Sequence, residues 1–222
     1  MTPKPDPHPR ARPGSTSARG TRRGAFLFVG AGALVALVIG VVIAISGGSD
    51  SRQPADGETP FGPITVSGAA LPALASTTED PAVGQAAPKI DGTTPTGAAA
   101  TVGGAGQPTM IVFLAHWCPH CQRELPLVVE LMRSGDLDGV RMVAIATGTS
   151  ADRPNYPPVP WLEREHWSGD TILDDEASSA AQAYGLSGYP FLVFLDADGK
   201  LVARASGELP AEDIVALADQ IR

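Results

Sequence analysis

The stretch TMIVFLAHWCPHC (residues 109–121) decides the fold of this chain, because it joins a continuous apolar run to a pair of cysteines. Thr109–Ala115 has the length of a β-strand and carries no charged side chain, as expected of a strand that is covered on both faces. Cys118 and Cys121 are the only two cysteines of the chain. We therefore expect a buried strand that delivers a Cys-x-x-Cys pair to the start of a helix.

The motif Trp117-Cys118-Pro119-His120-Cys121 has the features of a redox-active dithiol. Two residues between the thiols allow a small disulfide ring that opens and closes readily. The free N–H groups and the dipole at a helix start stabilise a thiolate on Cys118, and Pro119 suits the first helical turn. A protonated His120 would add positive charge near Cys118. The thiol of Cys121 would then attack a mixed disulfide and release the partner.

Three other uses of the cysteines compete with this interpretation. A zinc half-site would recruit His116, His120 or His166, but the chain offers one thiolate pair and no second cysteine cluster. A static disulfide in so small a ring would remove little entropy from the unfolded chain. The third alternative is a pair of inert buried thiols. We favour the redox site, for which neither a metal nor another cofactor is needed, and expect His116 and His166 on loops or on the surface.

Downstream of the motif, the pattern is that of an α/β domain. A helical face ends at Ser134–Gly135, and Val140–Ala146 and Phe191–Leu195 are strongly apolar strands. A turn signal at Asp196–Gly199 precedes an alternating return strand. Further elements are expected at residues 161–167 (helix), 171–173 (strand), 176–184 (helix) and 201–205 (the return strand). A last helix is expected to begin near Pro210, with an apolar face from Ile214 to Ile221. Helix-linked strands followed by a hairpin predict a mixed β-sheet with helices on both faces.

The charge distribution separates the ends of the chain. The net charge of −8 and the isoelectric point near 4.9 argue against a nucleic-acid-binding protein. Residues 1–24 nevertheless are basic and rich in proline, so we expect a disordered cytoplasmic tail. Residues 25–45 carry no charged side chain and would span about 31 Å as a helix, enough to cross a bilayer core of about 30 Å.

These patterns predict four regions. Residues 25–45 are interpreted as an uncleaved transmembrane signal anchor with its N-terminus in the cytoplasm, and a cleaved signal peptide is the rival interpretation. Residues 46–84 are rich in Gly, Pro, Ser, Thr and Ala and are predicted to be a flexible linker. Residues 85–222 are predicted to form the folded domain, which the anchor would hold outside the cell membrane.

The folded part resembles the thioredoxin superfamily. FLAHWCPHC followed by Glu124-Leu125-Pro126 is similar to the membrane-anchored TlpA-type thiol–disulfide oxidoreductases. The resemblance covers residues 85–222 and includes the run Gly188-Tyr189-Pro190 before an apolar strand. It implies a thioredoxin-like mixed sheet flanked by helices.

The resemblance also implies roles for single residues. Cys118 would be the attacking cysteine, Cys121 the resolving one and Glu124 an acid beside them. Pro190 would be a cis-proline that faces the cysteines, so that the backbone of Tyr189 lies next to Cys118. Trp117, Pro119, His120 and Tyr189 would form the environment of the site.

Departures from the family pattern leave the direction of electron transfer open. Val112 stands where thioredoxins proper keep a buried acid, and Tyr189 is larger than the usual residue before the cis-proline. The Pro119-His120 dipeptide is also that of strongly oxidising DsbA-type enzymes, whereas TlpA-type proteins are commonly reductants. Both directions therefore remain open.

The function expected from the sequence is thiol–disulfide exchange. Its partners would be protein thiols and disulfides and, by resemblance, a membrane redox partner. The alternative is a copper-chaperone-like metal-binding protein, or a partner-binding module, on the same fold. Copper-delivering relatives typically space their cysteines by three residues, a feature that this chain lacks.

Overall fold

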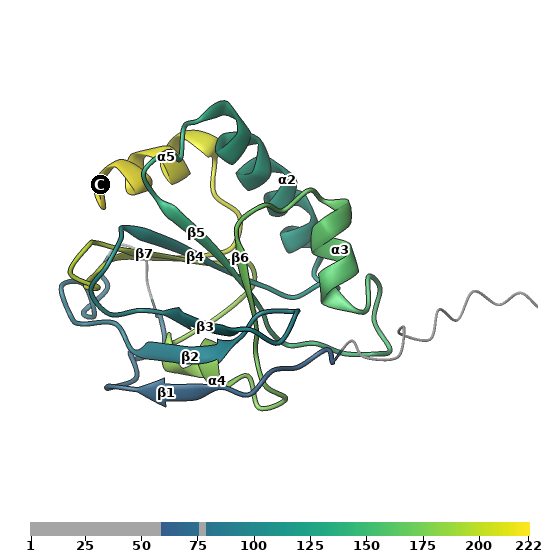
Figure 1. Ribbon diagram of the computed structural model, residues 1–222. Helices are drawn as coiled ribbons and strands as arrows, with labels where there is room; N and C mark the ends of the chain where they lie inside the picture. Colours follow the sequence, from purple (N-terminus) through teal and green to yellow (C-terminus); the bar gives the residue numbers. More distant parts are fainter. Residues whose placement is uncertain (1–58, 76–78) are drawn as a thin grey trace, which may run out of the picture. The chain divides into compact units, whose positions relative to one another are not determined.

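A five-stranded mixed β-sheet forms the centre of the computed structural model, which describes residues 59–75 and 79–222 (Figure 1). The strand order is β6-β5-β4-β7-β8. β4 is parallel to β5 and β5 to β6, whereas β7 is antiparallel to β4 and β8 to β7. The bounds are Thr109–Leu114 (β4), Arg141–Ala146 (β5), Asp170–Leu173 (β6), Phe191–Leu195 (β7) and Leu201–Ser206 (β8). The predicted mixed sheet is confirmed.

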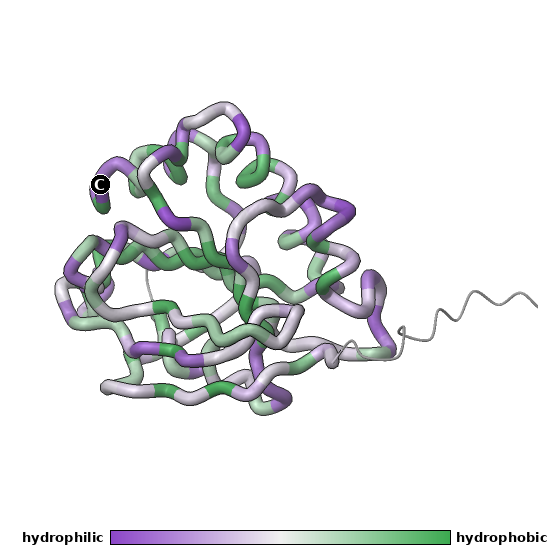
Figure 2. The backbone as a smooth tube through the Cα atoms, in the orientation of Figure 1, coloured by the Kyte–Doolittle hydropathy of each residue, from purple (hydrophilic) through white to green (hydrophobic). Residues whose placement is uncertain are grey.

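β4 is the middle strand of this sheet, and every one of its side chains is buried. Successive side chains of a strand point to opposite faces of the sheet. Met110 and Val112 accordingly belong to one hydrophobic cluster, and Ile111 and Phe113 to a second cluster on the other face. The central strands are the most hydrophobic part of the chain that Figure 2 colours. The cysteine pair therefore follows the carboxyl end of a central, buried strand.

Three helices cover one face of the sheet. They are α2 (Pro119–Ser134), α3 (Pro158–Arg164) and α5 (Ala211–Asp219), and Figure 1 shows them on the same side of the sheet. α2 begins directly after Cys118, with Pro119 in its first turn, and ends at Gly135, which adopts a left-handed conformation with φ of 89°. A glycine adopts this conformation without the steric cost of a Cβ atom. The predicted end of this helix is confirmed.

The opposite face is covered differently from the prediction. A second, three-stranded antiparallel sheet packs there together with the short helix α4 (Ser179–Ala183). Its strands, in the order β1-β2-β3, are Thr65–Ser67 (β1), Lys89–Thr93 (β2) and Ala99–Val102 (β3). The sequence did not predict this sheet, because its strands are short and carry few large apolar side chains.

The expectation that residues 46–84 form a linker and that the domain starts at residue 85 is wrong for the described part of that segment. Leu71 and Leu74 are buried in the second cluster, and Ala82 is fully buried. Asp80 forms an ion pair with Arg204 of β8, and both side chains are almost inaccessible to solvent. The segment joins the domain through a few well-placed residues and not through a periodic apolar pattern, so its composition resembles that of a linker.

The other predicted regions lie outside the described residues. These are the basic tail (1–24), the membrane anchor (25–45) and the first part of the linker (46–58). Among residues 59–75 and 79–222, no helix has both the length and the apolar character required to cross a bilayer.

Two helices differ in extent from the prediction. α3 begins at Pro158, three residues earlier than expected, because proline needs no N–H partner in a first helical turn. α4 is limited to Ser179–Ala183, and the carboxylate of Asp174 accepts hydrogen bonds from the backbone N–H groups of Ala180 and Ala181. This carboxylate satisfies N–H groups that a short helix leaves without partners.

Candidate redox site

Cys118 is the last residue before α2, at the carboxyl end of β4. Its backbone is extended and caps the helix, so the sulfur lies near the free N–H groups of the first turn. The residue retains 6% of its accessible surface. Its Sγ lies 3.9 Å from the backbone oxygen of Tyr189, on the loop before β7. Cys118 is therefore buried but keeps a small exposed surface.

Cys121 lies one turn further along α2 and is fully buried. Both cysteines are free thiols. Burial is the main cause that raises the pKa of Cys121, and the neighbouring Cys118 and Glu124 add to the rise. A hydrogen bond at the backbone of Ala115 opposes it. The two residues thus differ in exposure, and burial disfavours the ionised form of Cys121.

The loop before β7 lies next to Cys118 and forms one side of the site. The Tyr189–Pro190 peptide bond is cis, as expected, and Pro190 is buried. The ring of Tyr189 meets that of Trp117 edge to face, with 5.9 Å between centroids. Trp117 donates a hydrogen bond from Nε1 to the backbone oxygen of Gly148, at 2.8 Å. The residues predicted to surround the cysteines on this side are therefore brought together.

Gly148 explains how the large side chain of Tyr189 fits. A Cβ atom at Gly148 would lie 2.6 Å from the Tyr189 hydroxyl oxygen, closer than such atoms approach. Gly148 also has a φ of 59°, in the left-handed region that favours glycine. Burial raises the pKa of Tyr189, so the phenol remains protonated.

Glu124 is buried beneath the cysteines, with only 1% of its surface exposed. Its Oε1 accepts a hydrogen bond from the backbone N–H of Leu209, at 3.2 Å, on the loop between β8 and α5. Burial raises the pKa of Glu124 to about 7, and the charge of Glu208 contributes to the rise. A carboxyl group with such a pKa exchanges protons at neutral pH.

His120 is exposed and is paired with a residue that the sequence did not single out. Its Nδ1 lies 2.5 Å from Oε1 of Glu208, and the same carboxylate binds Arg123. Pro119, between Cys118 and His120, is exposed. Glu208 therefore links His120 and Arg123 on the first two turns of α2.

His116 lies on the turn between β4 and α2, in agreement with the expected loop position, but it is buried, with 1% of its surface accessible. Its Nδ1 donates to the backbone oxygen of Pro154 at 2.6 Å, and its Nε2 accepts from the N–H of Ser150 at 3.2 Å. Burial lowers the pKa of His116. The side chain thus connects the loop after β5 to the cysteine motif. Both of its ring nitrogens form hydrogen bonds with backbone groups.

The three histidines considered for a zinc half-site are not brought together. His116 is held by backbone groups, His120 pairs with Glu208, and His166 is exposed after α3. In residues 59–75 and 79–222, no three His, Cys, Asp or Glu side chains lie in a group that could hold a metal ion.

The comparisons with known proteins agree with this geometry. A family model described as "Thioredoxin-like domain" matches residues 96–222, more than half of the chain. The chain belongs to this thioredoxin-like family.

Its relatives include thiol–disulfide oxidoreductases. The thioredoxin-like chain is 29% identical to the methylamine utilization protein MauD of Methylobacillus flagellatus over 127 residues, which cover 56% of this chain and 57% of MauD. It is 27% identical to the thiol-disulfide oxidoreductase ResA of Geobacillus thermodenitrificans over 109 residues, 49% of this chain and 60% of ResA. The chain thus spans less than two thirds of the length of either relative.

A solved structure shows the same fold. It is the thioredoxin domain of a thiol-disulfide oxidoreductase from Bacteroides vulgatus, with a TM-score of 0.52 and 19% identity, and the match covers 64% of this chain and 99% of that domain. At this identity the likeness establishes the fold alone.

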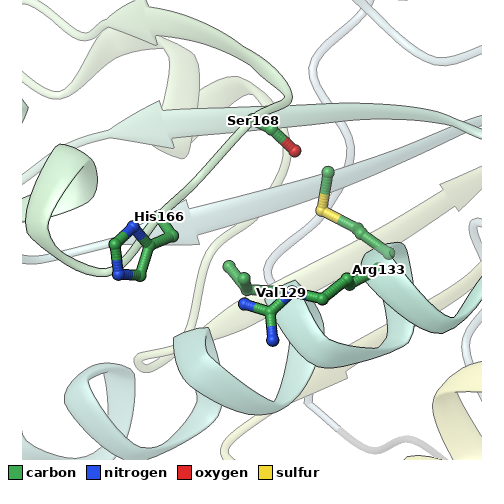
Figure 3. Close-up of a pocket in the computed structure, with 5 residues that line it drawn as sticks. Val129, Arg133, His166 and Ser168 are labelled. Carbon is green, nitrogen blue, oxygen red and sulfur yellow. The ribbon is translucent and has the colours of Figure 1, made fainter.

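A separate hollow of about 390 Å³ lies beside the second half of α2 (Figure 3). It is lined by Val129, Met132, Arg133, His166 and Ser168. Val129 is eight residues after Cys121, or about 12 Å along the helix axis. None of these lining residues is a thiol, so this hollow is distinct from the thioredoxin-like site.

Sequence reasoning missed three residues of the site, which make four contacts. Glu208 contacts His120 and Arg123, the N–H of Leu209 donates to Glu124, and the backbone oxygen of Gly148 accepts from Trp117. Their partners lie between 31 and 88 positions away in the chain. The one local signal was a glycine after an apolar strand at position 148, which marks a turn but not its partner.

Proposed function

We propose that this chain is a TlpA-type thiol–disulfide oxidoreductase that exchanges disulfides with protein thiols through Cys118 and Cys121. The observation that carries the proposal is the contrast between the two thiols. Cys118 caps a helix at the edge of the sheet and keeps a small exposed surface, whereas Cys121 is fully buried one turn behind it. This is the arrangement needed for one attacking and one resolving thiol.

In the reducing direction the chemistry has two steps. The thiolate of Cys118 attacks one sulfur of a partner disulfide, so a mixed disulfide forms and the partner's other sulfur leaves as a thiolate. Cys121 then loses its proton and attacks the Cys118 sulfur, which forms the Cys118–Cys121 disulfide and releases the partner's second thiolate. The partner gains two electrons and the chain loses two; oxidation of a partner is the reverse sequence.

Glu124 is the proposed proton acceptor for Cys121. The raised pKa of Cys121 means that this thiol does not ionise by itself at neutral pH. Glu124 lies close enough to influence that pKa, and its own pKa of about 7 suits transfer in both directions. No step needs a metal or an organic cofactor.

Partner docking is assigned to the aromatic side of the site. The backbone oxygen of Tyr189 faces Cys118 and is 3.9 Å from its sulfur. An extended peptide could donate a backbone hydrogen bond there, while Trp117 and Tyr189 contact its side chains. Backbone recognition of this kind accepts many sequences, as an enzyme acting on protein disulfides requires.

The proposed location is the outer side of the cell membrane. Support comes from the sequence, in which basic residues 1–24 precede the uncharged run 25–45. The domain would then face an environment in which disulfides form, and a membrane redox partner would renew its dithiol or disulfide. Reporter fusions after residue 60 should be active outside the membrane, and recovery of a mature chain that starts near residue 47 would show cleavage instead of anchoring.

The direct test is redox equilibration of the full-length protein in detergent with reduced and oxidised glutathione. We expect one reversible two-electron transition, detected by thiol counting, that is absent from Cys118→Ser and Cys121→Ser. A protein that shows no exchange and retains stoichiometric copper or zinc would overturn the proposal in favour of the metal-binding alternative.

A further inference from the structure

Glu208 connects the loop between β8 and α5 to the first turns of α2. Its carboxylate accepts hydrogen bonds from Arg123, at 3.1 and 3.2 Å from Nε and 2.5 Å from Nη2. It also lies 2.5 Å from Nδ1 of His120. Arg123 Nη2 and His120 Nδ1 are 2.8 Å apart, so one carboxylate holds both groups together.

These two groups follow the attacking thiol along α2. His120 is two residues after Cys118, and Arg123 follows His120 by three residues, so the side chains share one face of the helix. The carboxylate of Glu208 raises the pKa of Arg123, and a negative charge on Cys118 adds to that rise. The guanidinium therefore lies within electrostatic reach of a Cys118 thiolate.

The same loop also contacts the buried acid. The residue after Glu208 is Leu209, whose N–H donates to Glu124 at 3.2 Å. The charge of Glu208 contributes to the raised pKa of Glu124. One loop thus contacts Arg123 and His120 on the surface and the proposed proton acceptor Glu124 in the interior.

We propose that Glu208 is a positioning residue of the redox site, which holds Arg123 against His120 on the first turns of α2 and offsets the positive charge of Arg123. A free guanidinium within electrostatic reach of Cys118 would stabilise its thiolate and hence the reduced protein, which makes the disulfide more oxidising. Glu208 opposes this effect and shifts the cysteine pair towards a reductant. The inference rests on the proposed function and addresses the direction that the Pro119-His120 dipeptide leaves open.

The alternative is a solvated surface ion pair without effect on the cysteines. Many exposed pairs of this kind contribute nothing measurable, and the side chains of His120 and Arg123 are 59% and 55% exposed. The α2 helix provides a matched control in the exposed pair between Arg133 and Glu130, at 2.9 Å, in its last turns. A general effect of removing one negative charge would appear at both places.

The experiment compares Glu208→Gln with Glu130→Gln in the full-length protein in detergent, at low ionic strength and pH 8. The pKa of Arg123 is raised above its already high usual value, so its guanidinium stays charged at this pH and the comparison reports that charge. The equilibrium is protein disulfide plus two glutathione against protein dithiol plus glutathione disulfide. We expect Glu208→Gln to favour the dithiol about threefold, or about 14 mV, and Glu130→Gln to leave the equilibrium unchanged.

A second readout follows Cys118 itself. The ultraviolet absorbance of a thiolate follows its ionisation, and the raised pKa of Cys121 keeps that buried thiol protonated at neutral pH. The pKa of Cys118 should fall in Glu208→Gln and rise in Arg123→Gln, because the two variants remove opposite charges from the same cluster. Both shifts should shrink in high salt, which screens exposed charges.

The outcomes separate this inference from the proposed function. If the wild-type protein does not equilibrate with glutathione, the proposed function fails. If it equilibrates but Glu208→Gln behaves as Glu130→Gln does in both readouts, only the role of Glu208 is overturned. A shift of Glu208→Gln and Arg123→Gln in the same direction would likewise contradict it, since a charge effect requires opposite signs.

Discussion

Asp80 and Arg204 form a buried ion pair across 124 positions of the chain. The two carboxylate oxygens of Asp80 accept hydrogen bonds from Nη2 and Nε of Arg204, at 2.6 and 2.8 Å. Arg204 also donates from Nη1 to the backbone oxygens of Pro72 and Tyr184. A guanidinium that is fully buried is thus compensated on every side, and the segment before residue 85 is tied to β8.

Replacement of Asp80 by Asn should destabilise the domain by about 3 kcal/mol, because Arg204 keeps its charge in a buried site without a counter-ion. The measurement is denaturant unfolding followed by tryptophan fluorescence. The control is Asp91→Asn, which breaks an exposed pair with Lys89 and should leave the unfolding midpoint unchanged. Equal effects of the two variants would contradict the assignment.

The pH dependence of stability offers a second view of the same pair. Hydrogen bonding to Arg204 holds the pKa of Asp80 below its usual value. Its contribution is therefore complete above the unfolded pKa of about 3.9 and is lost as the pH falls through the lower folded pKa. Asp80→Asn should lack this loss of stability in acid, so its free energy of unfolding should change less with pH below about pH 4.

The two cysteines should behave differently when one is removed. Cys121→Ser keeps the accessible thiol and removes the group that resolves a mixed disulfide, so it should accumulate covalent complexes with disulfide-bonded proteins. Cys118→Ser leaves only the fully buried thiol and should accumulate few. Non-reducing electrophoresis measures the complexes. Similar yields from the two variants would contradict the assignment of an attacking and a resolving cysteine.

Glu124→Gln should slow the resolution of mixed disulfides about 100-fold at neutral pH, because Cys121 loses its proton acceptor. Stopped-flow release of a fluorescent partner thiol measures this step. Glutamine still accepts the N–H of Leu209, so the fold is retained. A resolution rate unchanged from wild type across the pH range would exclude Glu124 from proton transfer.

Glu124 also makes a prediction for stability. Its folded pKa of about 7 exceeds the unfolded value of about 4.3, so the folded state binds more protons between these values. The contribution of Glu124 to the free energy of unfolding should therefore be largest below about pH 4.3 and decrease as the pH rises to about 7, by up to about 3 kcal/mol. Glu124→Gln should remove this decrease. Urea unfolding at several pH values measures it, and a decrease of the same size in the variant would contradict the prediction.

His116 should release the loop after β5 in acid. Burial lowers its pKa, so the neutral ring accepts the Ser150 N–H until the pH falls below about 6.5. Protonation converts Nε2 into a donor and breaks this bond. The Ser150 amide should then lose protection from hydrogen exchange in mild acid. The Asp138 amide, bonded to Gly135 in a turn, is the control and should stay unchanged.

The central strands and the cysteine helix were predictable because their signals are local. Phe191–Leu195 was predicted at its observed bounds, and the strand before the motif and the end of α2 differ by at most one residue from the prediction. Apolar runs of strand length, a proline in a first turn and a glycine after a last turn each act on neighbouring residues only. Such features therefore form the same local structure in any fold that buries the strand.

The three-stranded sheet was not predictable from the same reasoning. β2 reads KIDGT, and of its residues only Ile90 is buried. A strand with one buried side chain has no alternation that distinguishes it from a loop. It forms because β1 and β3 supply its hydrogen-bond partners on both sides.

The sequence by itself determined the dithiol, its place between a buried strand and a helix, and the mixed central sheet. Only the tertiary structure decided which groups surround the thiols. Glu208 meets Arg123, Leu209 meets Glu124 and Asp80 meets Arg204 because folding brings distant loops to the same edge of the sheet. A carboxylate, a guanidinium or a backbone N–H forms such bonds with any complementary group within reach, so its residue type does not specify its partner.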